Sequence, residues 1–127
     1  MAGVMTVYVD NMEAPFGRMK MCHCWADTRE ELLQMMGAIG VQRKWFQRPN
    51  GAADFGMSAS WEHFDISLTK RALAVQHGAV EVSMFVMAEH ADRQKFHAAI
   101  KAGHYRRAEG ALRMMCLAAA MRRKRES

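Results

Sequence analysis

The pattern of apolar residues predicts short strands in the first two thirds of the chain. The predicted strands comprise residues 4–9, 18–25, 41–46 and 79–86. The first is apolar on both alternating faces apart from Thr6, as in a strand covered on both sides. The second alternates with the period of a strand, which places His23 on the opposite face from Cys22 and Cys24.

Helical spacing and capping signals predict four helices between and after these strands. They comprise residues 28–39, 67–77, 88–102 and 104–124. Thr28 and Glu31 have the spacing of a capping box, and Gly40 supplies a left-handed stop. An apolar stripe runs along the last helix from Tyr105 to Ala119. This order predicts an α/β fold, in which a small three- to four-stranded sheet is flanked by helices and followed by a C-terminal helical extension.

Composition agrees with one folded domain and indicates the cellular compartment. The chain has 127 residues, half of them hydrophobic, and a chain of this length has about two-thirds of its unfolded surface to bury in a core. No apolar run reaches the ~18 residues that span a bilayer, and no secretory signal precedes the first strand. Three cysteines are an odd number, which favours reduced thiols. We therefore expect a cytoplasmic protein without a membrane partner.

Charge divides the chain into two parts. Residues 1–87 hold eight Lys/Arg and nine Asp/Glu, whereas residues 88–127 hold ten Lys/Arg and four Asp/Glu. The basic surplus therefore lies entirely in the last third. We predict an α/β core domain over 1–87 and a basic helical extension over 88–127, packed on or beside the core.

A first group of polar side chains surrounds the predicted turn at Pro15. Asp10 follows the first strand directly, where α/β sheets bind ligands; the alternative is an aspartate that bonds its own turn. Arg18 and Lys20 share one strand face and suit a phosphate or carboxylate, although an exposed strand face has the same pattern. His23 titrates near neutrality and is a candidate general acid or base, or else a half-buried histidine bonded to a carbonyl.

A second polar group comprises His63, Asp65, Lys70 and Arg71. Asp65 or a neighbouring serine is predicted to cap the helix that begins near residue 67. Cations in the first turns of a helix favour an anion, so this segment is the second half of a candidate phosphate site. A plain helix cap with solvated Lys70 and Arg71 is the alternative.

An aromatic pair flanked by cations follows the first helix. Arg43 and Lys44 precede Trp45 and Phe46, an arrangement on which a base or nucleotide ring can stack. Such aromatic residues are more often core, and we expect one of the two to be buried.

No metal or cofactor is expected from the sequence. Strand alternation separates His23 from Cys22 and Cys24, so these three residues are poorly placed for one zinc ion. The chain also lacks the phosphate-loop, dinucleotide, zincin and nucleophile-elbow motifs.

The segment MTVYVDNMEAPFGRMKMCHCWAD, residues 5–27, resembles the opening of an uncharacterised bacterial and phage family of the domain-of-unknown-function type. The similarity continues in VQRKWF at 41–46 and in HFDISLTKRALAVQHGAVEV at 63–82. It covers residues 5–82, with 88–127 outside it. The resemblance implies a small α/β fold and supplies no established activity.

The residues lead to two functional hypotheses. The first is a protein that binds a phosphate-bearing ligand, namely a nucleotide, a nucleotide-derived signal or nucleic acid. Any hydrolysis would use His23 or His63 for proton transfer, with Asp10 and Asp65 as further catalytic candidates. The second is a phage-type inhibitor or adaptor that contacts a host defence complex through 88–127, and a homodimer formed by the same helices is a third possibility. The first requires the two polar groups to lie within about 10 Å of each other around a shared cavity.

Overall fold

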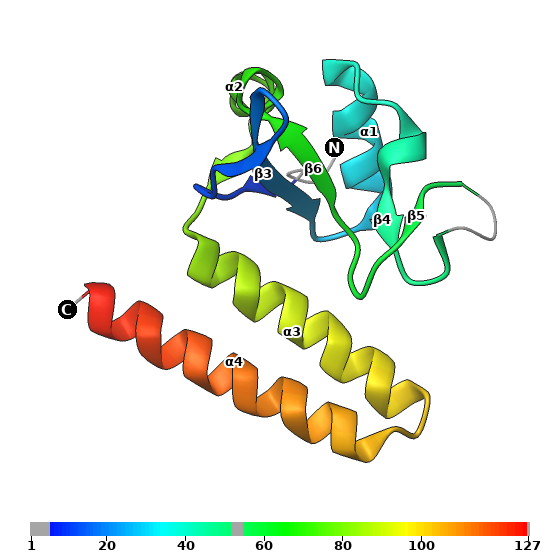
Figure 1. Cartoon of the computed structure of the whole chain (residues 1–127), viewed down its shortest axis with the longest axis vertical. Helices are drawn as coiled ribbons and strands as arrows, with labels where there is room; N and C mark the ends of the chain where they lie inside the picture. Colours follow the sequence, from blue (N-terminus) through cyan, green and yellow to red (C-terminus); the bar gives the residue numbers. More distant parts are fainter. Residues whose placement is uncertain (1–5, 52–54, 127) are drawn as a thin grey trace, which may run out of the picture. The chain divides into compact units, whose positions relative to one another are not determined.

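The computed structural model describes residues 6–51 and 55–126. The chain forms two compact units, Met1–Val82 and Ser83–Ser127. The predicted α/β fold with a helical C-terminal extension is confirmed, and Figure 1 shows the sheet with its two helices and the separate pair of long helices.

A mixed five-stranded sheet is the frame of the first unit. Its strands are β1 (Val7–Val9), β2 (Ala14–Phe16), β3 (Met19–Ala26), β6 (Phe64–Ser67) and β7 (Val80–Glu81). The long strand β3 is central: β1 and β2 pair with one of its edges and β6 pairs with the other, all antiparallel. β7 extends the sheet by parallel pairing with β1. A small parallel ladder, β4 (Gln47–Arg48) with β5 (Met57–Ser58), lies beside β6 through an isolated bridge from Gln47 to His63.

Two helices cover the apolar face of the sheet. Helix α1 (Arg29–Ile39) begins at Thr28, whose Oγ1 accepts from the Glu31 amide, and ends at Gly40 with φ 80°. Helix α2 (Leu68–Gln76) is capped by Ser67. Alternation along β3 and β6 directs one set of side chains into this core and the other set to the opposite face. The core side chains of these strands are Cys22, Cys24, Phe64 and Ile66.

The second unit is a helical hairpin. Helix α3 (Met84–Lys101) and helix α4 (Tyr105–Glu126) lie side by side and are joined by a turn at Gly103 with φ 76° (Figure 1). Arg122 of α4 donates to the carboxylate of Glu89 in α3 at 3.2 Å. No helix among the described residues is long and apolar enough to cross a membrane.

Several differences from the sequence-based prediction concern strands. Residues 41–46 are not a strand: a 3₁₀ turn, η1 (Arg43–Trp45), forms instead, because Val41 bonds back to the end of α1 and Phe46 bonds to Arg43. The last predicted strand shrinks to Val80–Glu81, since Ser83 already caps α3. Strands β2, β4, β5 and β6 were not predicted. The start of the first predicted strand and part of the glycine-rich loop, residues 52–54, lie outside the described residues.

Candidate functional site

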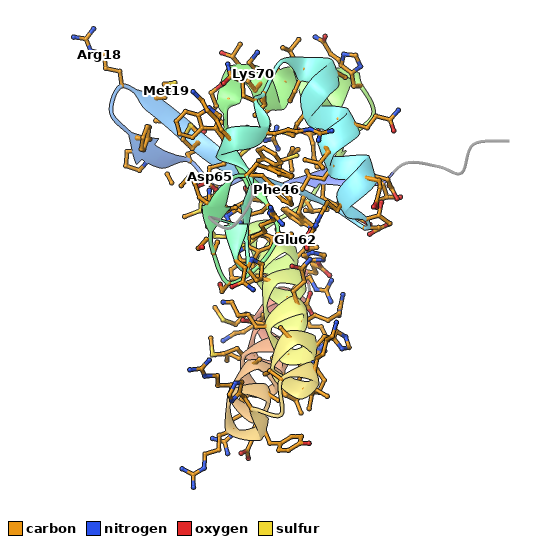
Figure 2. All side chains as sticks on the ribbon, turned by 90° about the vertical axis from the view of Figure 1, so that its right-hand side faces the viewer. Arg18, Met19, Phe46, Glu62, Asp65 and Lys70 are labelled. Atoms are coloured by element: carbon orange, nitrogen blue, oxygen red, sulfur yellow. The ribbon has the colours of Figure 1, made fainter. Side chains whose placement is uncertain are left out.

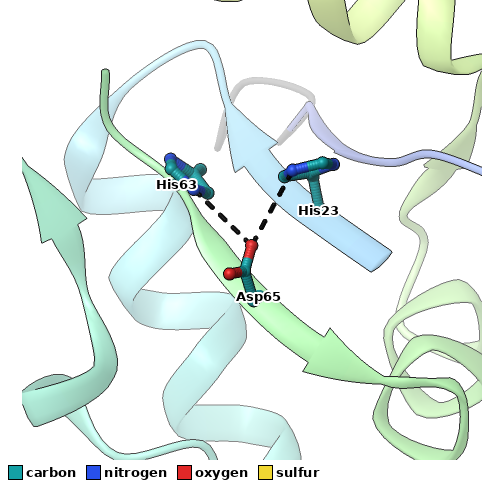
Figure 3. A group of neighbouring side chains, drawn as sticks. All are labelled: His23, His63 and Asp65. Carbon is teal, nitrogen blue, oxygen red and sulfur yellow. Dashed lines mark ion pairs between the residues drawn. The ribbon is translucent and has the colours of Figure 1, made fainter. Parts of the chain in front are cut away.

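Two histidines and one carboxylate point at one another on the face of the sheet opposite α1 and α2. The Nε2 of His23 lies 3.9 Å from Oδ1 of Asp65, and the Nε2 of His63 lies 3.5 Å from the same oxygen. Figure 3 shows both imidazoles turned toward Asp65. The ring centroids of His23 and His63 are 5.5 Å apart. The two polar groups of the sequence therefore converge, and we call His23, His63 and Asp65 the histidine–aspartate cluster.

Strand pairing is the reason for this convergence. The register of β3 and β6 sets His23 directly opposite Asp65, so the two side chains share one face as cross-strand neighbours. His63 precedes β6 by one residue and bridges to Gln47 on its other side. The core residues Cys22, Cys24, Phe64 and Ile66 anchor both strands from the opposite face.

Each member of the cluster is held by a second group. The Nδ1 of His23 lies 2.7 Å from Oδ2 of Asp10, and the Nδ1 of His63 lies 3.1 Å from the carbonyl oxygen of Trp61. Gln47 donates from Nε2 to Oδ2 of Asp65 at 2.8 Å. These partners orient each side chain and leave both Nε2 atoms and Oδ1 directed at a common point.

Asp10 is fully buried and is held from several sides. Its Oδ1 accepts from the backbone amides of His23 at 2.9 Å and Met12 at 3.3 Å. Its own carbonyl oxygen accepts from Nε of Arg71 at 2.9 Å. Asp10 therefore bonds its own turn, as the structural alternative held, and also orients His23.

The two histidines have opposite protonation preferences. Burial lowers the pKa of His63, and the nearby charge of Asp65 only partly offsets this effect. Burial also acts to lower the pKa of His23, but the hydrogen bond and charge of Asp10, together with the charge of Asp65, raise it above its ordinary value. His63 is thus kept neutral, with its proton on the Nδ1 that faces the Trp61 carbonyl.

The thiols next to His23 are structural. Cys22 and Cys24 are free and buried in the core. Burial raises the pKa of Cys22 to about 12 and also raises that of Cys24. Both are therefore protonated near neutrality and point away from His23, so the segment Cys22 to Cys24 does not gather its three side chains around one ion.

A largely apolar cavity of about 540 Å³ adjoins the cluster. His23, Asp65 and Gln47 form part of its wall, as do Ser67 and Lys70 at the start of α2. The rest of the wall includes the methionine and aromatic side chains Met12, Phe16, Met19, Met21, Trp45 and Met57.

Of the lysine and arginine residues predicted to bind a phosphate, one lines the cavity and others lie outside its wall. Lys70 lines the cavity while donating from Nζ to the Ile39 carbonyl at 2.7 Å. Arg18 lies at the tip of the β2–β3 turn, and its side chain points away from the strands (Figure 2). The Nζ of Lys20 lies 3.7 Å from a carboxylate oxygen of Glu13. Neither belongs to the cavity wall.

The remaining predicted ligand residues have structural partners. Arg71 joins Asp10 to Glu81, and Arg43 lies over the ring of Phe55. Lys44 has its Nζ 5.1 Å from the centre of the Trp45 ring. Of the aromatic pair, Phe46 is fully buried and Trp45 is 51% exposed, which agrees with the expectation that one would be core.

Two residues of the site were missed from the sequence. Trp61 stacks on His63, with ring centroids 4.0 Å apart and planes 14° apart, and its carbonyl fixes the imidazole. Gln47 orients Asp65. The proximity of Trp61 to His63 was a usable signal, whereas nothing in the local sequence relates Gln47 to Asp65.

These features occur in a chain that matches a family without an assigned role. Residues 7–96 match the model of the protein family of unknown function DUF4031, and the chain belongs to that family. The match extends into α3, further than the resemblance seen in the sequence. No curated protein and no solved structure matches the chain.

Proposed function

We propose that this chain is a cytoplasmic protein that binds a nucleotide or nucleotide-derived signal and hydrolyses a phosphoester bond in it. One observation carries the proposal: His23 and Asp65, held by buried or hydrogen-bonded partners, form part of the wall of an apolar cavity of about 540 Å³. Oriented titratable groups beside an apolar cavity are typical of ligand-binding and active sites. Nucleic acid is the alternative ligand with the same chemistry.

The cavity wall suits a flat, apolar group such as a base. Methionine side chains adapt their shape to a ligand and make favourable contacts with aromatic rings. Trp45 is exposed on this wall, and Lys44 lies near its ring, which adds a positive charge beside a stacking surface.

The start of α2 suits the phosphate. This nine-residue helix directs its N-terminus toward the cavity through Ser67 and Lys70. The positive end of the helix dipole and the Lys70 ammonium both favour an anion there. In hydrolysis, a water oxygen would bond to phosphorus as the bond to the leaving oxygen breaks. The water proton would pass through the histidine–aspartate cluster to the leaving oxygen.

The proposal is tested by isothermal titration calorimetry and turnover assays of the full chain against a panel of nucleotides. We expect Trp45→Ala to weaken binding by about 1–3 kcal/mol, roughly 5- to 150-fold, because it removes the stacking surface for one base. The fold is expected to stay intact, since Trp45 is half exposed.

Tyr105→Ala is the matched control, because Tyr105 is an exposed aromatic residue in the helical hairpin and outside the cavity wall. Its affinity should equal that of the unmodified chain. Absence of binding and turnover across the panel would contradict the proposed function.

A second candidate function is protein–protein contact through the helical hairpin, as a phage-type inhibitor or adaptor of host defence or as a homodimer. Met114, Leu117 and Met121 are exposed at helical spacing on α4, next to its basic end. We expect light scattering of the full chain to give a mass that rises with concentration, and expect Leu117→Lys with Met121→Lys to abolish the rise. A monomer at every concentration contradicts the homodimer and leaves a different protein as the partner.

A further inference from the structure

We propose that His23, His63 and Asp65 bind one divalent transition-metal ion, through Nε2 of each imidazole and Oδ1 of the carboxylate. The site follows from the geometry of the cluster alone. Its use in phosphoester hydrolysis rests on the function proposed above.

The three candidate ligand atoms are almost as close to one another as the ligands of a bound metal ion. All three ligand atoms lie within 4.8 Å of one another. The two distances to Oδ1 of Asp65 are 3.5 Å and 3.9 Å. Ligands about 2.0–2.2 Å from a tetrahedral ion are separated by about 3.3–3.6 Å from each other. Small rotations of the His23 and Asp65 side chains therefore bring all three atoms within bonding distance of a single ion.

The hydrogen bonds around the cluster select the form of each side chain that binds a metal. Asp10 and the Trp61 carbonyl both accept from an Nδ1–H, so in the neutral form of each imidazole the lone pair of Nε2 is directed inward. Gln47 occupies Oδ2 of Asp65 and leaves Oδ1 for the ion. A carboxylate or carbonyl behind each ligating histidine is the usual outer shell of a protein metal site.

Two imidazoles and one carboxylate favour zinc, iron(II), cobalt(II) or manganese(II) over calcium or magnesium, which prefer oxygen ligands. Three protein ligands leave at least one position for water or substrate, as in catalytic metal sites. The open side is that of Asp65, whose side chain is 43% exposed and lines the cavity.

A metal also resolves an electrostatic difficulty of phosphate binding. Asp65 lines the cavity and the buried Asp10 lies behind His23, so a phosphate at the cluster would meet the negative charge of two nearby carboxylates. A divalent ion neutralises this charge, binds a phosphate oxygen and lowers the pKa of a bound water. The histidines then act as ligands instead of proton carriers. The metal-bound water supplies the oxygen that bonds to phosphorus, and its proton passes through solvent to the leaving oxygen.

The test is calorimetric titration of the full chain, stripped with a chelator and dialysed, with Zn²⁺ and with Co²⁺. We expect one ion per chain, and cobalt absorption in the visible range typical of nitrogen and oxygen ligands. Asp65→Ala should lower the affinity at least ~10-fold, since it removes a ligand. This variant is preferred to His63→Ala because Asp65 is partly exposed, and circular dichroism checks that it is folded.

His77→Ala and Cys116→Ser are matched controls, since each removes an exposed potential ligand far in sequence from the cluster. Both should bind the metals like the unmodified chain. Absence of binding by the unmodified chain, full affinity in folded Asp65→Ala, or loss of binding in either control would overturn the site.

The titration contains no nucleotide, so its outcome is independent of the proposed function. Metal binding without nucleotide turnover would leave the metal site standing and refute hydrolysis. Nucleotide turnover that survives chelation would support hydrolysis and refute the metal's part in it.

Discussion

Replacing Asp10 with asparagine is expected to lower the affinity for a divalent metal by about 10- to 100-fold, although Asp10 is not itself a ligand. The carboxylate accepts from Nδ1 of His23 at 2.7 Å through Oδ2, while Oδ1 accepts from the His23 amide. The asparagine oxygen can keep the bond to the amide. Its NH₂ group then faces Nδ1 and requires an acceptor there. The imidazole proton moves to Nε2, and this tautomer cannot bind the ion.

Two measurements check this result together. Calorimetry with Zn²⁺ gives the loss of affinity, and nitrogen NMR of the imidazoles reports which ring atom of His23 carries the proton. A purely structural role of Asp10 would change the thermal midpoint without changing the tautomer.

Asp27→Asn is the matched control for Asp10→Asn. Asp27 directly follows β3, the strand that carries His23, and accepts from the Tyr8 hydroxyl at 3.1 Å rather than from a residue of the cluster. Its metal affinity should equal that of the unmodified chain. Unchanged metal affinity in Asp10→Asn would show that the Asp10 carboxylate has no part in orienting His23.

Replacing Phe64 with alanine is expected to lower the free energy of unfolding by about 3–5 kcal/mol, as for other buried phenylalanines. The Phe64 side chain is fully buried and stacks on Phe46 with ring centroids 5.1 Å apart. It is the first residue of β6 and lies between His63 and Asp65 in the chain, so it anchors the strand that brings both residues to His23. Loss of the Phe64 ring should therefore reduce the metal affinity of the histidine–aspartate cluster as well as the stability of the fold.

Urea unfolding followed by circular dichroism measures the change for Phe64→Ala. Phe16→Ala is the matched control, since the Phe16 side chain is 66% exposed and its removal leaves no core cavity. Its stability should stay within about 0.5 kcal/mol of the unmodified chain. Equal losses in the two variants would contradict the assignment of Phe64 to the core that supports the site.

Local patterns were sufficient for much of the fold. The capping residue Thr28 and the stop at Gly40 bound α1 as predicted, and the long helices near the C-terminus follow their apolar spacing. Alternation also put His23 on the face opposite Cys22 and Cys24. Short strands were harder to predict: β6 was missed because four residues beside a helix cap carry too little periodicity to be distinguished from a loop.

The sequence by itself determined the α/β class and the helical extension, and it singled out His23, His63 and Asp65 as candidates and Cys22 and Cys24 as buried thiols. Only the tertiary structure decided that β6 pairs with β3 so that His23 faces Asp65, that Asp10, Trp61 and Gln47 orient the cluster, and that Arg18, Lys20 and Arg71 lie elsewhere. The physical reason is the distance along the chain between the residues that interact. Helix caps and alternation depend on residues a few positions apart, whereas strand register and the partners of long cationic side chains depend on contacts between distant segments.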